Sequence, residues 1–347
     1  MFSRLLASLV VLAALAAGVL LAWPQLVGLQ DQLGIAQLIA FRAWLIVGAA
    51  GATVILLLLL FVRPLRPLMA ALAVVAVLFG AANTGILVSR GLTQASTASA
   101  RTETVGTASG DSITVLSWNT LGGHPGAAAV AKLALDSKAD IVSLPETTDA
   151  FATQVAEKMR AGGQPMWALG LSFSEIYKAR STALLISPAL GDYTVQSAGG
   201  TGPPGNTNVS PTVVAKPDDG EGPTIVAVHA VSPIQGEMAN WRSDLSWLSD
   251  QCAGDDVIMA GDFNATLDHL AGRGTDGGVV GRCHDAALAV GSAAVGTWPS
   301  DMPLLLGAPI DHVMATPTWQ TTSFRVVSSL DALGSDHRPI VATLKRR

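Results

Sequence analysis

The first 90 residues contain almost no charge. Their six charged side chains are Arg4, Asp31, Arg42, Arg63, Arg66 and Arg90. A water-soluble helical region needs a polar face, so this scarcity argues against a cytosolic domain and favours a segment that lies in a bilayer. The rest of the chain carries 16 Lys and Arg against 25 Asp and Glu, a net charge of about −9. The sequence therefore joins a membrane-like region to a mildly acidic soluble domain.

Cysteine is nearly absent. Cys252 and Cys283 are the only two, and neither belongs to a Cys-x-x-Cys pair, which excludes the common structural zinc sites. Both lie in the soluble part, where they fit either one disulfide outside the cytoplasm or two unrelated buried thiols. The spacing leaves both alternatives open.

Basic clusters are absent as well, and the longest basic run is Lys345-Arg346-Arg347 at the end of the chain. Nonspecific DNA binding depends largely on Lys and Arg that neutralise phosphates. A soluble domain with a net negative charge is poorly suited to that task. We therefore disfavour a nucleic-acid substrate, although a surface-anchored nuclease stays as the second hypothesis.

The low-charge region contains three long apolar stretches, over residues 5–23, 44–62 and 68–88. Each is close to the roughly 20 residues that a helix needs to cross a bilayer. Trp23 and Trp44 lie at their ends, where interfacial aromatic residues are expected. We predict three transmembrane helices in a membrane region over residues 1–90. The alternative for the first stretch alone is a cleaved signal peptide.

The arginines between these stretches predict the orientation. Arg4 precedes the first stretch, and Arg63 and Arg66 lie between the second and third, so the positive-inside rule places both sites in the cytoplasm. Three arginines weaken this bias: Arg42, Arg90 and Arg101. We expect a multi-pass protein of the cell membrane whose soluble domain is extracytoplasmic.

The soluble part begins after a Ser-, Thr-, Ala- and Gly-rich stretch over residues 91–112, which is typical of a flexible linker. From 113 to 347, short β-rich runs alternate with amphipathic stretches. The pattern predicts helices over 127–137, 148–160 and 236–251. It predicts strands over 113–118, 141–144, 182–186, 212–215, 224–228, 257–260, 312–315, 322–327 and 340–344. We expect two packed sheets covered by helices on both outer faces, with a long Gly-rich surface loop over 271–281.

Several of these strands end in a polar residue. Gly261-Asp262-Phe263-Asn264 follows a buried strand, and its carboxylate can deprotonate water while its amide donates to a phosphate oxygen. An ordinary Asx-turn is the alternative. Glu146 also ends an apolar strand, where a buried carboxylate needs a partner that a Mg²⁺-type ion would supply.

The last part of the chain adds an Asp-His pair. Asp336 can contact a metal or a water, and His337 can bind or protonate an oxyanion. Asp311 can hold the His337 imidazole in one tautomer. Asn119 and His229 also follow apolar strands, where a turn amide and a core histidine are the alternatives.

The order and spacing of these motifs resemble the endonuclease/exonuclease/phosphatase (DNase I-like) superfamily over about residues 113–344. The matching motifs are Trp118-Asn119, Pro145-Glu146, His229 with Pro233, Gly261-Asp262-Phe263-Asn264, Ile310-Asp311-His312 and Ser335-Asp336-His337. The resemblance implies a four-layered α/β sandwich. It also implies a metal-dependent hydrolase, with Mg²⁺ or Mn²⁺ as the cofactor.

The resemblance implies a role for each matching residue. Glu146 would bind the metal with Asn119 and Asp336, and Asp262 would prepare the attacking water. The phosphate would be held by Asn264 and His229, while Asp311 and His337 would stabilise the transition state or protonate the leaving oxygen. The chain departs from the family in having Pro145 where Gln is common, and in lacking a Gly in the strand 181–187. Upstream of that strand, Tyr177 and Arg180 can supply the phosphate contact that some members take from Tyr or Arg.

These features together indicate a membrane-anchored, divalent-metal-dependent phosphoesterase. The expected substrate is a phosphorylated lipid or another cell-envelope phosphoester, with polyprenyl diphosphate as a candidate. The arrangement resembles bacterial membrane members of the superfamily that are associated with resistance to glycopeptides such as teicoplanin. A catalytically inactive binding module is the third hypothesis, which the complete set of site residues disfavours.

Overall fold

The computed structural model describes residues 2–93, 112–174, 176–197 and 201–347. Its contacts divide the chain into two compact units, Met1–Arg90 and Gly91–Arg347.

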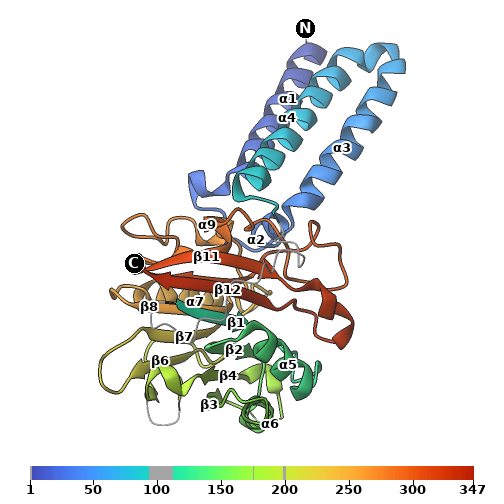
Figure 1. Ribbon diagram of the computed structural model, residues 1–347. Coiled ribbons are helices and arrows are strands. Elements are labelled where there is room, and N and C mark those ends of the chain that lie inside the picture. Colours follow the sequence, from blue (N-terminus) through green and yellow to red (C-terminus); the bar gives the residue numbers. More distant parts are fainter. Residues whose placement is uncertain (1, 94–111, 175, 198–200) are drawn as a thin grey trace. The chain divides into compact units, whose positions relative to one another are not determined.

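Three long helices make up most of the first unit (Figure 1). They are α1 (Phe2–Ala22), α3 (Arg42–Leu58) and α4 (Arg66–Arg90), and a short helix α2 (Ile35–Ala40) precedes α3. The apolar spans cover Arg4–Ala22, Arg42–Phe61 and Arg63–Arg90, which are 19, 20 and 28 residues long. All three are long and apolar enough to cross a membrane, which confirms the prediction of three such helices.

Arg42 lies inside this helical unit and is only 3% exposed. Its Nη1 donates to Oδ1 of Asn83 on α4 at 2.6 Å, and its Nη2 donates to the carbonyl oxygen of Ala22 at the end of α1 at 3.0 Å. A buried guanidinium needs such acceptors because its desolvation is costly. Arg42 therefore ties the three long helices together and is not an exposed loop charge.

The second unit contains two six-stranded sheets. The first sheet has the order β11 (Trp319–Val326), β12 (Ile340–Arg346), β1 (Ser112–Ser117), β2 (Ile141–Pro145), β4 (Ser181–Ile186) and β3 (Trp167–Ser172). The second has the order β5 (Tyr193–Val195), β6 (Val213–Pro217), β7 (Thr224–His229), β8 (Val257–Asp262), β10 (Asp311–Ala315) and β9 (His284–Asp285). The pairs β1–β2 and β7–β8 are parallel and the other neighbours are antiparallel, so both sheets are mixed.

The alternation of apolar residues along the strands builds two hydrophobic layers. Ile141 of β2 belongs to the cluster shared with the second sheet, which also holds Ile258 of β8. Val142, the next residue, belongs instead to the cluster under helices α5 (Ala127–Ser137) and α6 (Asp149–Ala161). Figure 1 shows α5 and α6 beside the first sheet. Helix α7 (Met238–Gln251) buries the face that includes Trp241. The architecture is the expected sandwich of two mixed sheets flanked by helices.

Every predicted strand and helix of this unit is present, and no end shifts by more than three residues. Among the described residues, the prediction missed β3, β5 and β9 and the short helices α8 (Leu267–Leu270) and α9 (Ala286–Ala289). β3 is exposed or half-buried along its whole length, so its sequence lacks the apolar alternation of a core strand.

The expected flexible linker needs a correction at its start. Most of it, residues 94–111, lies outside the described residues. Its first residues are not free, because the Thr93 amide donates to the Gly291 carbonyl and the Ala294 amide donates to the Gly91 carbonyl, both at 3.0 Å. These residues are part of the second unit.

The two cysteines form a disulfide, which settles the alternative that the sequence left open. Cys252 follows α7 and Cys283 precedes β9, with their Cα atoms 5.9 Å apart. Both side chains are fully buried. The bond closes the Gly-rich loop between them at its base.

Candidate active site

Three of the expected residues lie in one row across the second sheet. The strand register places His229 of β7 beside Asp262 of β8, and Asp262 opposite Asp311 of β10. Adjacent strands bring such residues to within about 5.5 Å between Cα atoms. The strand ends that the sequence marked as polar therefore meet at one edge.

The first sheet contributes Asn119 and Glu146, which follow β1 and β2. The Asn119 amide nitrogen Nδ2 donates to Oε1 of Glu146 and to Oδ2 of Asp262, both at 3.1 Å. The Asn119 Oδ1 accepts from the Leu121 amide at 3.0 Å, which fixes the orientation of the side chain. Asn119 is therefore the bridge between the carboxylates of the two sheets.

His337 lies between two carboxylates. Its Nδ1 is 2.9 Å from Oδ2 of Asp311, and its Nε2 is 3.6 Å from Oδ2 of Asp262. Burial lowers the pKa of the imidazole, but the charges of Asp311 and Asp262 outweigh it and raise the pKa to about 10. The ring is therefore a cation at neutral pH. Asp311 contacts it at Nδ1, the position from which the sequence predicts that Asp311 orients the imidazole.

At Asp262 the effect of burial on the pKa outweighs the opposing effects of its neighbours. Burial raises its pKa to about 7, against the lowering effects of the His337 charge and of hydrogen bonds from the Asn264 backbone amide and from Asn119. The Asn264 amide donates to Oδ1 of Asp262 at 2.8 Å. A carboxylate with a pKa near neutrality is matched to proton transfer at physiological pH.

His229 is neutral in this site, because burial first and the His337 charge second lower its pKa to about 3. Its Nδ1 lies 3.3 Å from the Thr182 hydroxyl on β4, and its backbone amide donates to the Thr212 hydroxyl. A neutral imidazole can donate one hydrogen bond to a phosphate oxygen without adding charge.

The backbone is constrained where the site residues protrude. Glu146 and Asn264 have φ values of 54° and 48°, in the left-handed region that non-glycine residues rarely adopt. At Gly261 an added Cβ would lie 2.0 Å from the Val228 carbonyl oxygen. The glycine is therefore required by the close approach of β7, rather than only by the turn that the sequence suggested.

The group expected to bind the metal has the chemistry of a hard-cation site. Burial raises the pKa of Glu146, which the hydrogen bond from Asn119 partly offsets. The neighbouring Asp336 has one buried oxygen, Oδ1, without a hydrogen-bond partner among the described residues, while Oδ2 accepts from the Trp298 indole at 2.9 Å. Oxygen ligands of this kind suit Mg²⁺ or Mn²⁺.

Asp262, Asp311 and His337 form a second group with metal-ligand atoms within 4.8 Å of one another. The His337 imidazole bonds Oδ2 of Asp311, whereas Oδ1 of Asp311 is buried without a hydrogen-bond partner among the described residues. Glu146, Asn119 and Asp336 stay the predicted cation ligands, and Asp262, Asp311 and His337 are a second candidate group.

Tyr177 and Arg180 are not joined to this site by any hydrogen bond or ion pair in the described part of the chain. Tyr177 is 70% exposed. The Arg180 guanidinium donates to the carbonyl oxygens of Asn208 and Val209 at 2.7 and 3.2 Å. Their role as phosphate ligands stays a prediction.

Three further residues support the site without a predicted role, although Ser335 belongs to one of the matching motifs. Trp298 orients Asp336, and Thr182 contacts His229. The Ser335 hydroxyl donates to the Asn119 carbonyl at 2.6 Å and accepts from the His337 amide at 3.1 Å. The position of Ser335 directly before Asp336 was a usable signal, whereas Trp298 and Thr182 act through tertiary contacts that no local pattern reveals.

A buried carboxylate of near-neutral pKa, a histidine cation and carboxylate oxygens that suit a hard cation are the groups that metal-assisted hydrolysis of phosphate esters uses. Residues 116–337 match the model of the Endonuclease/Exonuclease/phosphatase family, and the chain belongs to this family. Members of the superfamily are metal-dependent phosphoester hydrolases.

Solved structures share the fold. The endonuclease/exonuclease/phosphatase from Beutenbergia cavernae is 18% identical, with a TM-score of 0.52, and the match covers 68% of this chain and 72% of that chain. Caenorhabditis elegans TDP2 is 18% identical, with a TM-score of 0.51 and coverage of 86% and 92%. D. rerio TDP2 complexed with a single-strand DNA product is 15% identical, with a TM-score of 0.50 and coverage of 67% and 99%. At these identities the likeness shows the fold alone. No curated protein is significantly similar in sequence.

Proposed function

We propose that this protein is a membrane-anchored phosphoesterase that uses Mg²⁺ or Mn²⁺ to hydrolyse a lipid phosphate. The observation that carries the chemistry is the environment of Asp262. This buried carboxylate has a pKa near 7 and is contacted by Asn119, Asn264 and His337. Such an arrangement prepares a water molecule for attack on phosphorus.

Each residue has a defined task in this mechanism. Asp262 accepts the proton of the attacking water, and Asn264 and neutral His229 donate hydrogen bonds to phosphate oxygens. The His337 cation, oriented by Asp311, stabilises the charge that develops in the transition state and supplies a proton to the leaving oxygen. A metal held by Glu146, Asn119 and Asp336 would supply Lewis-acid stabilisation of the phosphate.

The membrane unit and the charge of the domain support a lipid substrate. Three apolar helices keep the domain at a bilayer, where lipid phosphates are concentrated. The soluble part lacks a long basic run and is net negative, which disfavours nucleic acid. Polyprenyl diphosphate is our leading candidate, in keeping with the resemblance to membrane members associated with teicoplanin resistance. The nuclease alternative is supported by the likeness in fold to TDP2 in complex with a DNA product.

Two observations support an extracytoplasmic domain. Disulfides persist mainly in oxidising compartments, and Cys252 and Cys283 are bonded. Arg42 counted against this orientation in the sequence, yet it is buried and bonded to Asn83. Because Arg42 is not a loop charge, the orientation predicted by the positive-inside rule depends mainly on Arg4 and on the arginines between α3 and α4.

A substrate panel tests the proposal. Full-length protein in detergent is incubated with lipid phosphates, sugar phosphates, DNA and RNA, with Mg²⁺, with Mn²⁺ and with excess chelator. We expect metal-dependent phosphate release from lipid phosphates, and none from the Glu146→Gln variant. Preferential cleavage of DNA or RNA would favour the nuclease, and no turnover of any substrate would favour an inactive binding module.

A further inference from the structure

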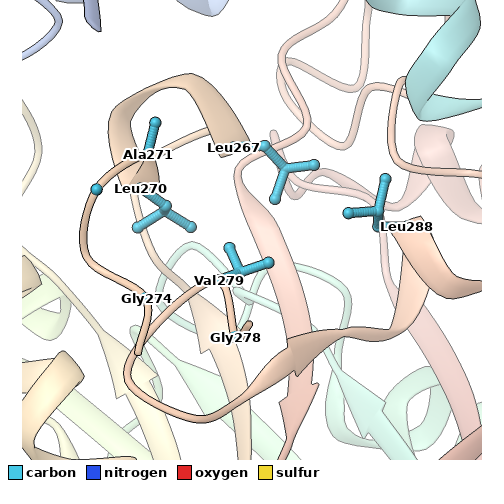
Figure 2. A pocket seen from close by; sticks show the side chains of 8 residues that line it. Leu267, Leu270, Ala271, Gly274, Gly278, Val279 and Leu288 are labelled. Carbon is cyan, nitrogen blue, oxygen red and sulfur yellow. The ribbon is translucent and has the colours of Figure 1, made fainter. Parts of the chain in front are cut away.

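An apolar pocket of about 300 Å³ lies in the second unit, and none of the predicted catalytic residues lines it. It is lined by Leu267, Leu270, Ala271, Gly272, Gly274, Gly278, Val279 and Leu288. Figure 2 shows the side chains of Leu267, Val279 and Leu288 gathered around one hollow. None of the lining residues is charged or has a polar side chain, so the pocket is suited to a hydrocarbon ligand rather than to a phosphate.

The wall of the pocket is a braced Gly-rich loop. An added Cβ at Gly274 would lie 1.8 Å from the Gly278 carbonyl oxygen, and one at Gly278 would lie 2.3 Å from that of Gly281. Backbone hydrogen bonds of 2.7 Å join Thr275 to Gly281 and Val279 to Cys283. The disulfide of Cys283 closes the base of the loop. The glycines thus allow a tight wall without side chains that would fill the hollow.

The pocket is joined to the catalytic residues by a short chain of contacts. Leu267 is the third residue after Asn264, at the start of α8. The carbonyl oxygen of Ala265, between them, lies 2.9 Å from Nε2 of His312, the neighbour of Asp311 in β10. The pocket wall at Leu267 is therefore three residues along the chain from Asn264, in a segment fixed by the contact between Ala265 and His312.

The opposite wall is joined to the start of the catalytic unit. Leu288 lies on α9, whose N-terminal cap Asp285 is 2.7 Å from Nδ1 of His312. The turn after α9 is hydrogen-bonded to Thr93. Ser292 Oγ donates to the Thr93 carbonyl at 2.6 Å, and the Gly291 carbonyl accepts from the Thr93 amide. Gly91 follows Arg90, the last residue of an apolar helix, directly in the chain.

We infer that this pocket binds the apolar chain of the lipid phosphate whose head group is hydrolysed at Asp262. The inference rests on the proposed function and adds a second subsite to it. Its occupant is a hydrocarbon chain because the side chains of the lining are all apolar, because Leu267 in its wall lies three residues after Asn264, and because the Gly-rich wall is braced by backbone hydrogen bonds and a disulfide.

The test compares Leu288→Glu with Leu305→Glu in full-length protein reconstituted in nanodiscs. Leu288 and Leu305 are similarly exposed, at 39% and 49%, but only Leu288 lines the pocket. The two substrates are dodecyl phosphate and ethyl phosphate, which differ only in chain length. Each methylene that leaves water contributes about 0.8 kcal/mol, or roughly fourfold, so burial of even two favours the long chain more than tenfold.

We expect wild type and Leu305→Glu to prefer dodecyl phosphate in kcat/KM by at least tenfold, in line with that transfer free energy. Leu288→Glu should lose this preference while keeping its turnover of ethyl phosphate, which also shows that the variant is folded. An unchanged preference in Leu288→Glu would contradict the pocket as the site that binds the hydrocarbon chain, while the proposed phosphoesterase function would stand.

A binding measurement separates the pocket from the chemistry. Dodecanol carrying a terminal diazirine has no phosphate, and its photolabelling is mapped by mass spectrometry of peptides. We expect labelling within residues 267–288 of the wild type that is lost in Leu288→Glu and kept in Leu305→Glu. Labelling without phosphate release would reject the proposed function and retain an alkyl-chain site. Phosphate release without labelling there would reject the pocket alone.

Discussion

Removing the contact between Asp311 and His337 is the most direct test of the proposed mechanism. Asp311→Asn keeps the size and shape of the side chain but removes its charge. The Asp311 Oδ2 lies 2.9 Å from His337 Nδ1, and both side chains are buried. Asp262, 3.6 Å from the other ring nitrogen, is then the one remaining carboxylate beside the imidazole.

The expected loss of activity follows from the free energy that this contact contributes. A hydrogen bond to a charged group contributes about 1.5–3 kcal/mol, and each 1.36 kcal/mol is tenfold in rate. The His337 cation acts on charge that develops in the transition state, so most of the loss should appear in kcat. We expect kcat to fall about 10²-fold, with a change of less than about threefold in KM.

The assay is a double-mutant cycle on the phosphate-releasing reaction. His337→Ala should lower kcat by about two or more orders of magnitude, and His337→Ala/Asp311→Asn should be no slower than that single variant. Asp285→Asn is the matched control, because Asp285 also holds a buried histidine, His312, at 2.7 Å. The control should lower the melting temperature while changing kcat far less. Losses that add in the double variant would refute an action of Asp311 through His337.

Three further predictions concern the metal, the pH dependence of stability and the membrane unit. Glu146→Gln should abolish metal-dependent turnover without unfolding the domain, and full activity of this variant in chelator would contradict the metal assignment. Burial lowers the pKa of His312, but the hydrogen bond and charge of Asp285 outweigh it, so the folded-state pKa lies above 6.5. His312 should therefore stabilise the fold fully below about pH 6.5, and this contribution should decline by about 1.4 kcal/mol per unit as the pH rises toward the folded-state pKa. Urea unfolding of wild type and His312→Gln from pH 6 to 9 checks this, and parallel pH profiles would contradict it. Deletion of residues 1–90 should reduce hydrolysis of a lipid phosphate in bilayers far more than that of a short soluble phosphoester, whereas equal loss would mean that the helices are needed for folding.

The positions of the main elements could be predicted because local signals carry them. Apolar runs of membrane length predict the helices, and the Thr148 hydroxyl accepts from the Phe151 amide at 3.4 Å, as expected of an N-cap. The motif strands end in polar residues, which predicts a shared rim. The structure places Asn119, Glu146, Asp262, Asn264, Asp311 and His337 in one network of close contacts, and the strand register places His229 beside Asp262. Their catalytic roles stay predictions.

The remaining features depend on pairings between distant parts of the chain. The row of His229, Asp262 and Asp311 requires a strand register that joins residues 33 and 49 positions apart in sequence. The burial of Arg42 depends on its hydrogen bond to Asn83 on another helix, and the hydropathy of the sequence does not reveal that pairing. The Gly-rich surface loop over 271–281 was expected, but its glycines fit close backbone contacts that become visible only after the loop has closed.

The amide of Asn119 has a consequence for ligand-linked stability. It joins Glu146 of the first sheet to Asp262 of the second, and a cation held by Glu146, Asn119 and Asp336 would contact groups that follow β1 and β2 and precede β12, which only the folded chain brings together. Such a cation binds the native state alone and stabilises it by RT ln(1 + [M]/Kd), about 2.7 kcal/mol at a hundred times Kd. Added Mg²⁺ should thus raise the unfolding temperature of the whole sandwich in one cooperative transition. Cellular metal supply would then set the lifetime of the protein as well as its rate of turnover.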